Sequence, residues 1–295
     1  MFHSQPDIGA RNLDCRKPDF EMRAQNWRKA ETVAGIHAQT AFHVEAVRFA
    51  VGERTLLGPV TLALQRSRVY GLIGHNGSGK STLIKLLARQ QPASSGGITF
   101  AQRPLVQWGA RELARALAYL PQTTPAATGL TVRELATLGR YPWHGALGRF
   151  GHEDRRHVEE ALVLTDMADF TDRLVDELSG GERQRAWLAM LVAQNAGVML
   201  LDEPISALDI AHQVEVLGLV RDLSRKRDLC VVVVLHDPNM AARYCDELIA
   251  LKDGRLLTRG TPDQIMQGDV LKGIFGVEMG VFAHPVTGQP IGYVQ

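Results

Sequence analysis

A glycine-rich run between a strand-like segment and a helical segment has the residue types that bind phosphate groups. It matches the pattern GxxxxGK[ST], and with the threonine that follows it comprises Gly74, His75, Asn76, Gly77, Ser78, Gly79, Lys80, Ser81 and Thr82. Glycines let backbone N–H groups approach phosphate oxygens, and the helix that follows directs its positive end toward the same anion. In this pattern the lysine bridges the β- and γ-phosphates and the Ser81 hydroxyl holds Mg²⁺. An accidental glycine turn would not require these flanking elements, so we expect a site for ATP or GTP.

Two adjacent carboxylates provide a second candidate group. Asp202 and Glu203 directly follow the apolar segment 198–201, which has the length and composition of a buried strand. At the carboxyl edge of a parallel sheet, Asp202 can orient Mg²⁺ through water and Glu203 can act as general base for an attacking water. Helix capping or simple solvation would explain such a pair by itself. Its combination with the phosphate loop favours catalysis.

The elements around these residues alternate between strands and helices, which predicts a mostly parallel α/β sheet. Further strands are expected to begin near Ala41 and to cover 69–73 and 230–235, with a hairpin turn at Asp253-Gly254. Between about 125 and 180 the pattern becomes helical. Thr131 and Glu134 form a capping box there, and 152–170 is predicted to be a helix throughout. We expect a helical insertion in an α/β core.

Composition limits the classes of function. The chain has 295 residues with 45% hydrophobic residues, and its 33 Lys plus Arg against 32 Asp plus Glu leave a net charge of only +1. A nucleic-acid binder normally has a strong basic excess, so we expect no nucleic-acid partner. The three cysteines are widely separated, which argues against a disulfide framework or a structural zinc site. No apolar run reaches the roughly 18 residues that would span a bilayer.

The first 42 residues differ from the rest. They have no sustained periodicity and no apolar core of the kind a secretory signal needs. We interpret 1–42 as an unstructured extension or the product of an upstream start, with a regulatory tail as the alternative.

A serine-glycine-glycine motif decides between nucleotide-binding families. Leu178-Ser179-Gly180-Gly181-Glu182-Arg183-Gln184 opens a helix, and Ser179 with Glu182 forms a capping box, so one interpretation is simply a well-started helix. Glycines at a helix N-terminus also form a second phosphate-binding surface. The motif resembles the LSGGQ signature of ATP-binding-cassette (ABC) proteins, with Glu182 in place of glutamine.

Other segments resemble the remaining motifs of that family in the expected order. Gln122 in Tyr119-Leu120-Pro121-Gln122 resembles the Q-loop, and Ser206-Ala207-Leu208-Asp209 resembles the D-loop. His236, after the polyvaline strand, resembles the switch histidine. Phe49 stands where the family has an aromatic residue that stacks on adenine, although an aromatic residue at a strand end is a core residue nearly as often.

The resemblance implies a fold and a mechanism. It implies an α/β P-loop NTPase cassette with a mostly parallel core sheet, an antiparallel β subdomain and a helical insertion that carries the signature. Two cassettes would pack head to tail as a homodimer, so that Ser179, Gly180, Gly181 and Asp209 act on the ATP bound to the partner subunit. Glu203, His236 and Gln122 would be catalytic, and Ser81, Gln122 and Asp202 would form the Mg²⁺ site. The likeness covers about 43–260, so we assign 43–265 to the ATPase domain and 266–295 to a C-terminal segment packed on it.

One segment points to a branch of the family. The run 139–151, GRYPWHGALGRFG, lies in the helical insertion and is rich in glycine and aromatic residues. Without the family context, a loop folded over its own aromatic cluster would explain it. It closely resembles the ATPases of iron–siderophore and cobalamin-type importers, above all those of ferric hydroxamate (ferrichrome) importers.

That branch implies an ATPase that energises import of a ferric siderophore through a separate membrane permease. The chain would lie peripherally on the cytoplasmic face of the inner membrane, and a periplasmic binding protein would deliver the substrate. Alternatives are another iron chelate, haem or cobalamin as cargo, or a soluble non-transport ABC ATPase, although no coiled-coil insertion or second cassette is present. A nucleotide sensor that does not hydrolyse ATP is disfavoured because Lys80, Asp202, Glu203 and His236 are all present.

Two residues depart from the family pattern. Ile205 replaces the usual Thr or Ser, which removes at most one hydrogen bond worth about 1 kcal/mol. Pro238 lacks a donor N–H where a non-proline is usual, but proline is accepted in the first turn of a helix. We therefore expect neither change to inactivate the enzyme.

Overall fold

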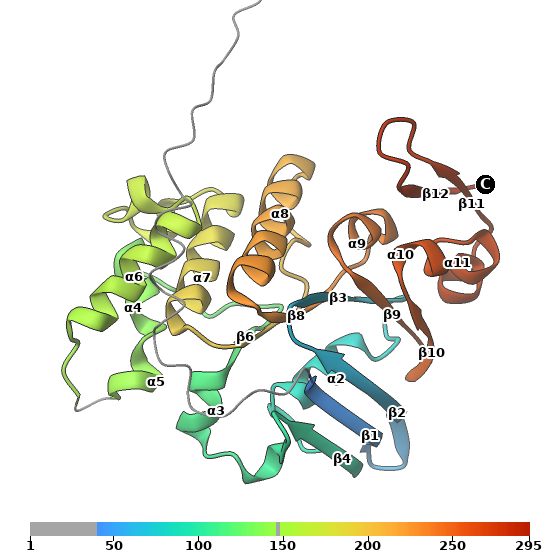
Figure 1. Cartoon of the computed structure of the whole chain (residues 1–295), viewed down its shortest axis with the longest axis horizontal. Helices are drawn as coiled ribbons and strands as arrows, with labels where there is room; N and C mark the ends of the chain where they lie inside the picture. The colour runs from blue at the N-terminus through green and yellow to red at the C-terminus, as the bar shows by residue number, and fades with distance from the viewer. Residues whose placement is uncertain (1–39, 146–147) are drawn as a thin grey trace, which may run out of the picture. The chain divides into compact units, whose positions relative to one another are not determined.

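The computed structural model describes residues 40–145 and 148–295 (Figure 1). The predicted extension 1–42 lies almost wholly outside the described residues. The strand expected near Ala41 is present as β1 (Thr40–Val51). None of the described helices is long and apolar enough to cross a bilayer.

The central sheet has six strands in the order β10-β9-β3-β8-β7-β6. Its parallel strands are β3 (Arg68–Ile73), β6 (Leu117–Leu120), β7 (Val198–Leu201), β8 (Cys230–Val234) and β9 (Glu247–Lys252). The antiparallel edge strand β10 (Arg255–Gly260) follows β9 through the predicted Asp253-Gly254 turn. The mostly parallel sheet inferred from the alternation of strands and helices is therefore confirmed.

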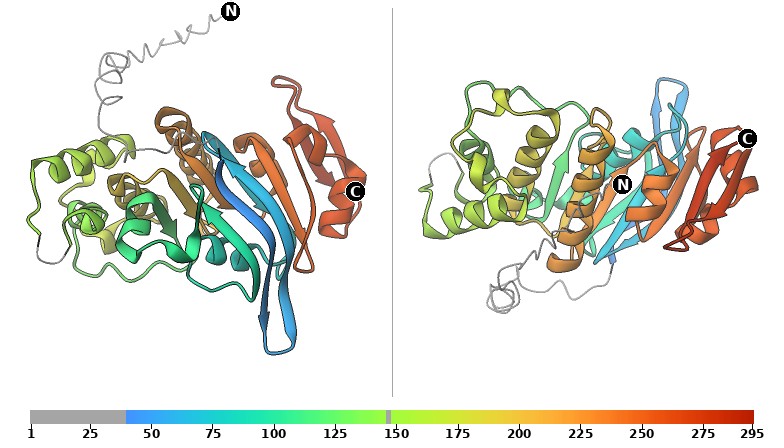
Figure 2. Two further views of the ribbon diagram at one scale, coloured as in Figure 1. Left: turned by 60° about the horizontal axis from the view of Figure 1, so that its bottom comes forward. Right: turned by 90° about the horizontal axis from the view of Figure 1, so that it is seen from above.

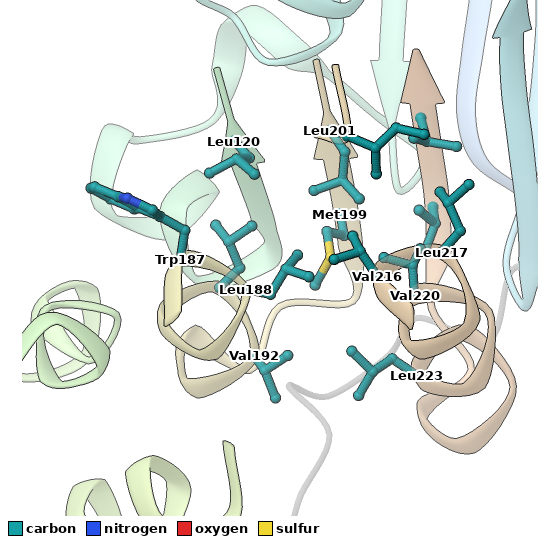
Figure 3. Close-up of a cluster of buried hydrophobic side chains, with 14 of the residues drawn as sticks. Leu120, Trp187, Leu188, Val192, Met199, Leu201, Val216, Leu217, Val220 and Leu223 are labelled. Carbon is teal, nitrogen blue, oxygen red and sulfur yellow. The ribbon is translucent and has the colours of Figure 1, made fainter. Parts of the chain in front are cut away.

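The two faces of this sheet pack against different layers. Alternate residues such as Val69, Met199 and Val231 face the helices α7 (Gly180–Gln194) and α8 (Ile210–Arg227), and Figure 3 shows part of this core. The intervening residues, such as Tyr70 and Val232, face α2 (Lys80–Leu87) and the antiparallel sheet. Coverage of both faces explains why these strands contain almost no polar residues.

The antiparallel β subdomain implied by the resemblance is a four-stranded sheet in the order β2-β1-β4-β5. Its strands after β1 are β2 (Arg54–Gln65), β4 (Ser95–Phe100) and β5 (Arg103–Pro104). Figure 1 shows this sheet on the side of the central sheet opposite α7 and α8. The 3-10 turn η2 (Leu105–Gln107) and helix α3 (Ala110–Ala116) connect it to β6.

The helical insertion is present, with one correction. It contains α4 (Val132–Leu138), α5 (Tyr141–His144), α6 (His152–Leu164), η3 (Ala168–Phe170) and η4 (Val175–Glu177) before α7 begins. Thr131 caps α4 through the predicted capping box. The helix predicted over 152–170 ends at Leu164, because Asp166 adopts a φ of 55°, which interrupts a right-handed helix.

The C-terminal residues pack against the end of the central sheet. After α9 (Pro238–Tyr244) and β10 come α10 (Pro262–Ile265), α11 (Gly268–Phe275), β11 (Met279–Ala283) and β12 (Pro290–Val294). The Asn239 amide joins α9 to β12 through two hydrogen bonds with the Gly292 backbone, at 2.8 and 3.0 Å. Leu271 is fully buried against Met266 and Ala242.

Candidate active site

The phosphate loop connects β3 to α2. Gly79 caps α2 with a φ of 101°, a conformation that strongly favours glycine. A Cβ atom there would also lie 2.9 Å from the Leu57 side chain of β2. The tight turn and the close approach of β2 therefore both require glycine at this position.

Lys80 is folded into the loop. Its ammonium group donates hydrogen bonds to the carbonyl oxygens of Gly74 and His75 at 2.8 and 2.9 Å, and the residue is 4% exposed. Burial lowers the pKa of Lys80, an effect that Glu203 and Asp202 partly offset. A phosphate group in the loop would supply a negative partner to this buried cation.

Asp202 and Ser81 form a group of oxygen atoms suited to a hard cation. The Ser81 hydroxyl donates to Asp202 Oδ1 at 3.0 Å, and Asp202 is fully buried. Its Oδ2 has no hydrogen-bond partner among the described residues, and burial raises its pKa. A buried carboxylate oxygen without a partner beside a hydroxyl fits Mg²⁺, which prefers oxygen ligands. The amide nitrogen of Gln122, the third residue predicted for the metal site, donates instead to Glu203.

Three strands bring the predicted catalytic residues together. Glu203 Oε1 lies 2.9 Å from His236 Nε2, and Glu203 Oε2 accepts a hydrogen bond from Gln122 Nε2 at 2.9 Å. These residues follow the carboxyl ends of β7, β8 and β6, which are neighbours in the parallel sheet. Glu203 has a φ of 54°, which is uncommon for a residue with a side chain and frequent at functional sites. The carboxylate is thus held from both sides.

A cavity of about 310 Å³ lies on the phosphate loop. The loop residues from Asn76 to Thr82 and Glu203 line it, together with Arg54 and Leu56 of β2, which sequence reasoning did not identify. Phe49 does not line this cavity. Phe49 is partly buried against the core and is paired with Leu57. This position does not support the predicted contact with adenine, which stays a prediction.

The signature residues begin α7 and contact the D-loop. The Ser179 hydroxyl accepts a hydrogen bond from Glu182 N at 3.3 Å, which completes the predicted capping box, and Ser179 and Gly180 are exposed. A Cβ atom on Gly181 would lie 2.1 Å from the His212 ring. Asp209 in turn caps α8 and accepts from His212 N at 2.9 Å. The signature and D-loop of one chain therefore form a continuous packed unit.

Gly180 lines a second cavity of about 200 Å³ with Gln122, Glu203 and Leu208. The signature residues are absent from the lining of the phosphate-loop cavity in the described part of the chain. Glu203 lines both cavities, and the action of the signature on a nucleotide bound to the partner subunit stays a prediction.

Comparisons with known proteins identify the family. The sequence model described as "ABC transporter" matches residues 57–206. A probable siderophore transport system ATP-binding protein of Bacillus subtilis is 39% identical over 85% of this chain and 92% of its own length. The iron(3+)-hydroxamate import ATP-binding protein of the same organism is 37% identical over 84% of this chain and 92% of that protein. This chain is an ABC transporter ATPase.

Two further similarities concern other relatives and the fold. A hemin import ATP-binding protein of Streptomyces coelicolor is 41% identical to this ABC ATPase over 82% of the chain and 85% of that protein. A solved structure of a metal-chelate type ABC transporter in an inward-facing conformation superposes with a TM-score of 0.76 at 24% identity, covering 88% of this chain and 97% of that one. At this identity the structural likeness supports the fold alone, and it confirms the predicted cassette.

Both departures from the family pattern are accommodated in this ABC ATPase. Ile205 is 7% exposed and packs into the core beside the central sheet, where an apolar side chain is favourable. Pro238 is the first residue of α9, and the Asp237 side chain accepts hydrogen bonds from Asn239 N and Met240 N at 2.7 and 3.4 Å. Proline therefore removes no hydrogen bond from this helix.

The segment 139–151 contains the short helix α5 where sequence analysis expected a loop. Ala146 and Leu147 lie outside the described residues. The His144 ring lies edge-on to Tyr141 and Phe150, with ring centroids 6.2 and 6.0 Å apart, so part of the predicted aromatic cluster is present. Trp143 instead points toward α7, where its Nε1 donates to Gln194 O at 2.8 Å.

Proposed function

We propose that this ABC ATPase energises the import of a ferric siderophore through a separate membrane permease. The observation that carries the proposal is the combination of an assembled Glu203–His236–Gln122 centre with relatives that are named as siderophore and iron(3+)-hydroxamate transport ATPases. Ferric hydroxamate is the cargo that the segment 139–151 favours. Another iron chelate, haem or cobalamin is the alternative, and the hemin import relative keeps haem open.

In the proposed reaction the phosphate loop and Lys80 bind the triphosphate of ATP. Glu203 accepts a proton from the attacking water as its oxygen bonds to the γ-phosphorus, and the bond to the bridging oxygen of ADP breaks. Gln122 donates a hydrogen bond to the carboxylate and the His236 ring nitrogen lies against its other oxygen, at 2.9 Å each, and the two contacts fix its orientation toward that water. Mg²⁺ held by Ser81 and Asp202 would neutralise charge on the phosphate oxygens.

The quaternary arrangement is part of the proposal. Two copies would pack head to tail, so that Ser179 and Gly180, both exposed, contact the nucleotide bound to the partner subunit. Loss of the γ-phosphate would remove this contact and release the dimer. The helical insertion would bind the permease on the cytoplasmic side of the membrane, and a periplasmic binding protein would deliver the cargo.

Uptake of radiolabelled ferrichrome in a strain that lacks this chain tests the proposal. Complementation with the wild type should restore uptake, whereas Glu203→Gln should leave it at background although the protein accumulates normally. Haem and cobalamin uptake in the same strains would identify the alternative cargoes. Unchanged ferrichrome uptake in the deletion strain, with no redundant ATPase, would contradict ferric hydroxamate import.

A second experiment tests the transport class itself. The tagged chain is recovered from membranes, and co-purifying proteins are identified by mass spectrometry. A polytopic permease is expected. Recovery of ribosomal or DNA-repair proteins in its place would indicate a soluble, non-transport ABC ATPase.

A further inference from the structure

The cavity on the phosphate loop has one wall that the motifs do not explain. This wall is the start of β2, where Arg54 and Leu56 line the cavity while Leu57, on the opposite face of the strand, is fully buried in the core. Side chains two residues apart share one face of a strand. Arg54 and Leu56 are therefore presented together to the cavity.

The pairing of β1 with β2 places Phe49 on the other face. Phe49 is paired with Leu57, and directly paired residues of an antiparallel ladder lie on the same side of the sheet. A register shift then separates Phe49 from Ala50, after which Val51 is paired with Arg54. The aromatic residue thus faces the core, and the arginine takes the position beside the cavity.

Hydrogen bonds fix this end of β2 against the phosphate loop. Gly58 N donates to Gly254 O at 2.6 Å, and Gly254 N donates to Ser78 O at 3.1 Å. The Asp253-Gly254 turn therefore joins β2 directly to the phosphate loop. Figure 2 shows the β1–β2 ribbon, in blue, with the connection between its two strands projecting beyond the rest of the sheet. These bonds hold Gly58, four residues along β2 from Arg54, close to the phosphate loop, and Arg54 itself lines the cavity on that loop.

The cavity also has a direction. Its inner end contains Lys80, which is 4% exposed, and its outer end contains the exposed Arg54. Because the phosphate loop binds the triphosphate at the inner end, the base of the nucleotide must lie toward the outer end. Among the described residues no carboxylate forms an ion pair with Arg54, so its planar guanidinium is available to stack on an aromatic ring.

We propose that Arg54, with Leu56 beside it, forms the surface on which the base of the bound nucleotide lies, in the role predicted for Phe49. This inference rests on the proposed ATP hydrolysis and adds the residue that holds the base. Stacking on a guanidinium depends on the π-face that every base has, so the contact supports affinity without selecting strongly among bases.

The test compares Arg54→Ala, Arg54→Lys and Phe49→Leu in the purified full-length chain, with Arg155→Ala on the exposed side of α6 as matched control. Calorimetry measures the Kd of ADP and of inorganic tripolyphosphate in the presence of Mg²⁺, and steady-state assays measure KM and kcat for ATP. Arg54→Ala should raise the Kd of ADP and the KM of ATP about fivefold. It should leave kcat and the Kd of tripolyphosphate within about twofold of wild type.

The lysine variant separates planarity from charge. Arg54→Lys keeps the positive charge but lacks the planar group, so it should resemble Arg54→Ala if the arginine stacks on the base. Equal weakening of ADP and tripolyphosphate binding in Arg54→Ala would show a phosphate contact and overturn the proposal. If Arg54→Ala keeps the wild-type Kd of ADP and KM of ATP while Phe49→Leu raises the KM of ATP, the role returns to Phe49. A wild type that binds ADP but does not support uptake would contradict the transport proposal alone, whereas a wild type that binds no ADP would overturn both.

Discussion

Acid should destabilise this ABC ATPase through one buried histidine of the helical insertion. His157 lies on α6, is 7% exposed, and has an Nδ1 atom without a hydrogen-bond partner among the described residues. Burial lowers its pKa to about 4, and the nearby positive charges of Arg140, Arg156 and Arg227 act in the same direction against the opposing charge of Glu153. The folded protein therefore favours neutral His157.

The sign and the size of the effect follow from proton linkage. Because the folded pKa lies below the unfolded value of about 6.5, the unfolded chain binds the proton more tightly. The stabilisation is fully present above about pH 6.5 and is lost as the pH falls toward about 4. Between pH 7 and pH 5, two pKa values of about 6.5 and about 4 correspond to a loss of about 2 kcal/mol in the free energy of unfolding.

The assay is urea denaturation followed by circular dichroism at pH 7, 6 and 5. His157→Leu should remove about 2 kcal/mol of the pH-dependent loss seen in the wild type, whatever it does to stability at pH 7. His152→Gln, at an exposed histidine that begins the same helix, is the matched control and should retain the full loss. If His157→Leu loses as much stability as the wild type between pH 7 and pH 5, the account of His157 is refuted.

Three further substitutions test contacts around α7. Asp154→Asn weakens the ion pair with Arg140, which is 3% exposed, and should lower the free energy of unfolding in urea by about 3 kcal/mol at pH 7. An unchanged urea midpoint would contradict this prediction. Gly181→Ala places a Cβ atom 2.1 Å from the His212 ring and should reduce ATP turnover. Adding His212→Ala should recover part of the lost turnover. No recovery in the double variant would show that the clash is not the cause. Gln194→Met should lower the free energy of unfolding in urea by about 2 kcal/mol, because the Gln194 amide donates to the carbonyl oxygens of Ala114 in α3 and Leu117 in β6. A cost below about 0.5 kcal/mol would count against those bonds.

Local patterns were sufficient to identify the two carboxylates at the centre of the site, whereas Gln122 and His236 were identified by the family resemblance. The apolar strand β7 is followed at once by Asp202 and Glu203, and parallel strands place their carboxyl ends at one edge of a sheet. The position of Gln122 after β6 and of His236 after β8 then follows from the same rule. The proximity of these residues depends on strand order, which neither the local patterns nor the family resemblance predicted.

These rules could not predict the positions of residues that lie on irregular backbone. The pairing of β1 with β2 changes register four times, and each change alters which side chains share a face, so alternation in the sequence could not place Phe49 in the core or Arg54 at the cavity. The same limit applies to the end of α6, where a single residue with positive φ, Asp166, stops a helix that its composition would allow to continue.

The helix α7 has both of its ends fixed by contacts that neither pattern nor propensity reveals. At its N-terminus the signature packs against α8, where Gly181 lies beside the His212 ring. At its C-terminus three successive carbonyl oxygens accept hydrogen bonds at 2.8 to 3.1 Å from other elements, and the donors are Arg227 to Val192, Arg140 to Ala193 and Trp143 to Gln194. Donors that are cationic or buried make such bonds costly to lose. A displacement of α5 must therefore break the bonds from Arg140 and Trp143 or carry α7 with it, and with α7 the Ser179 hydroxyl at its other end.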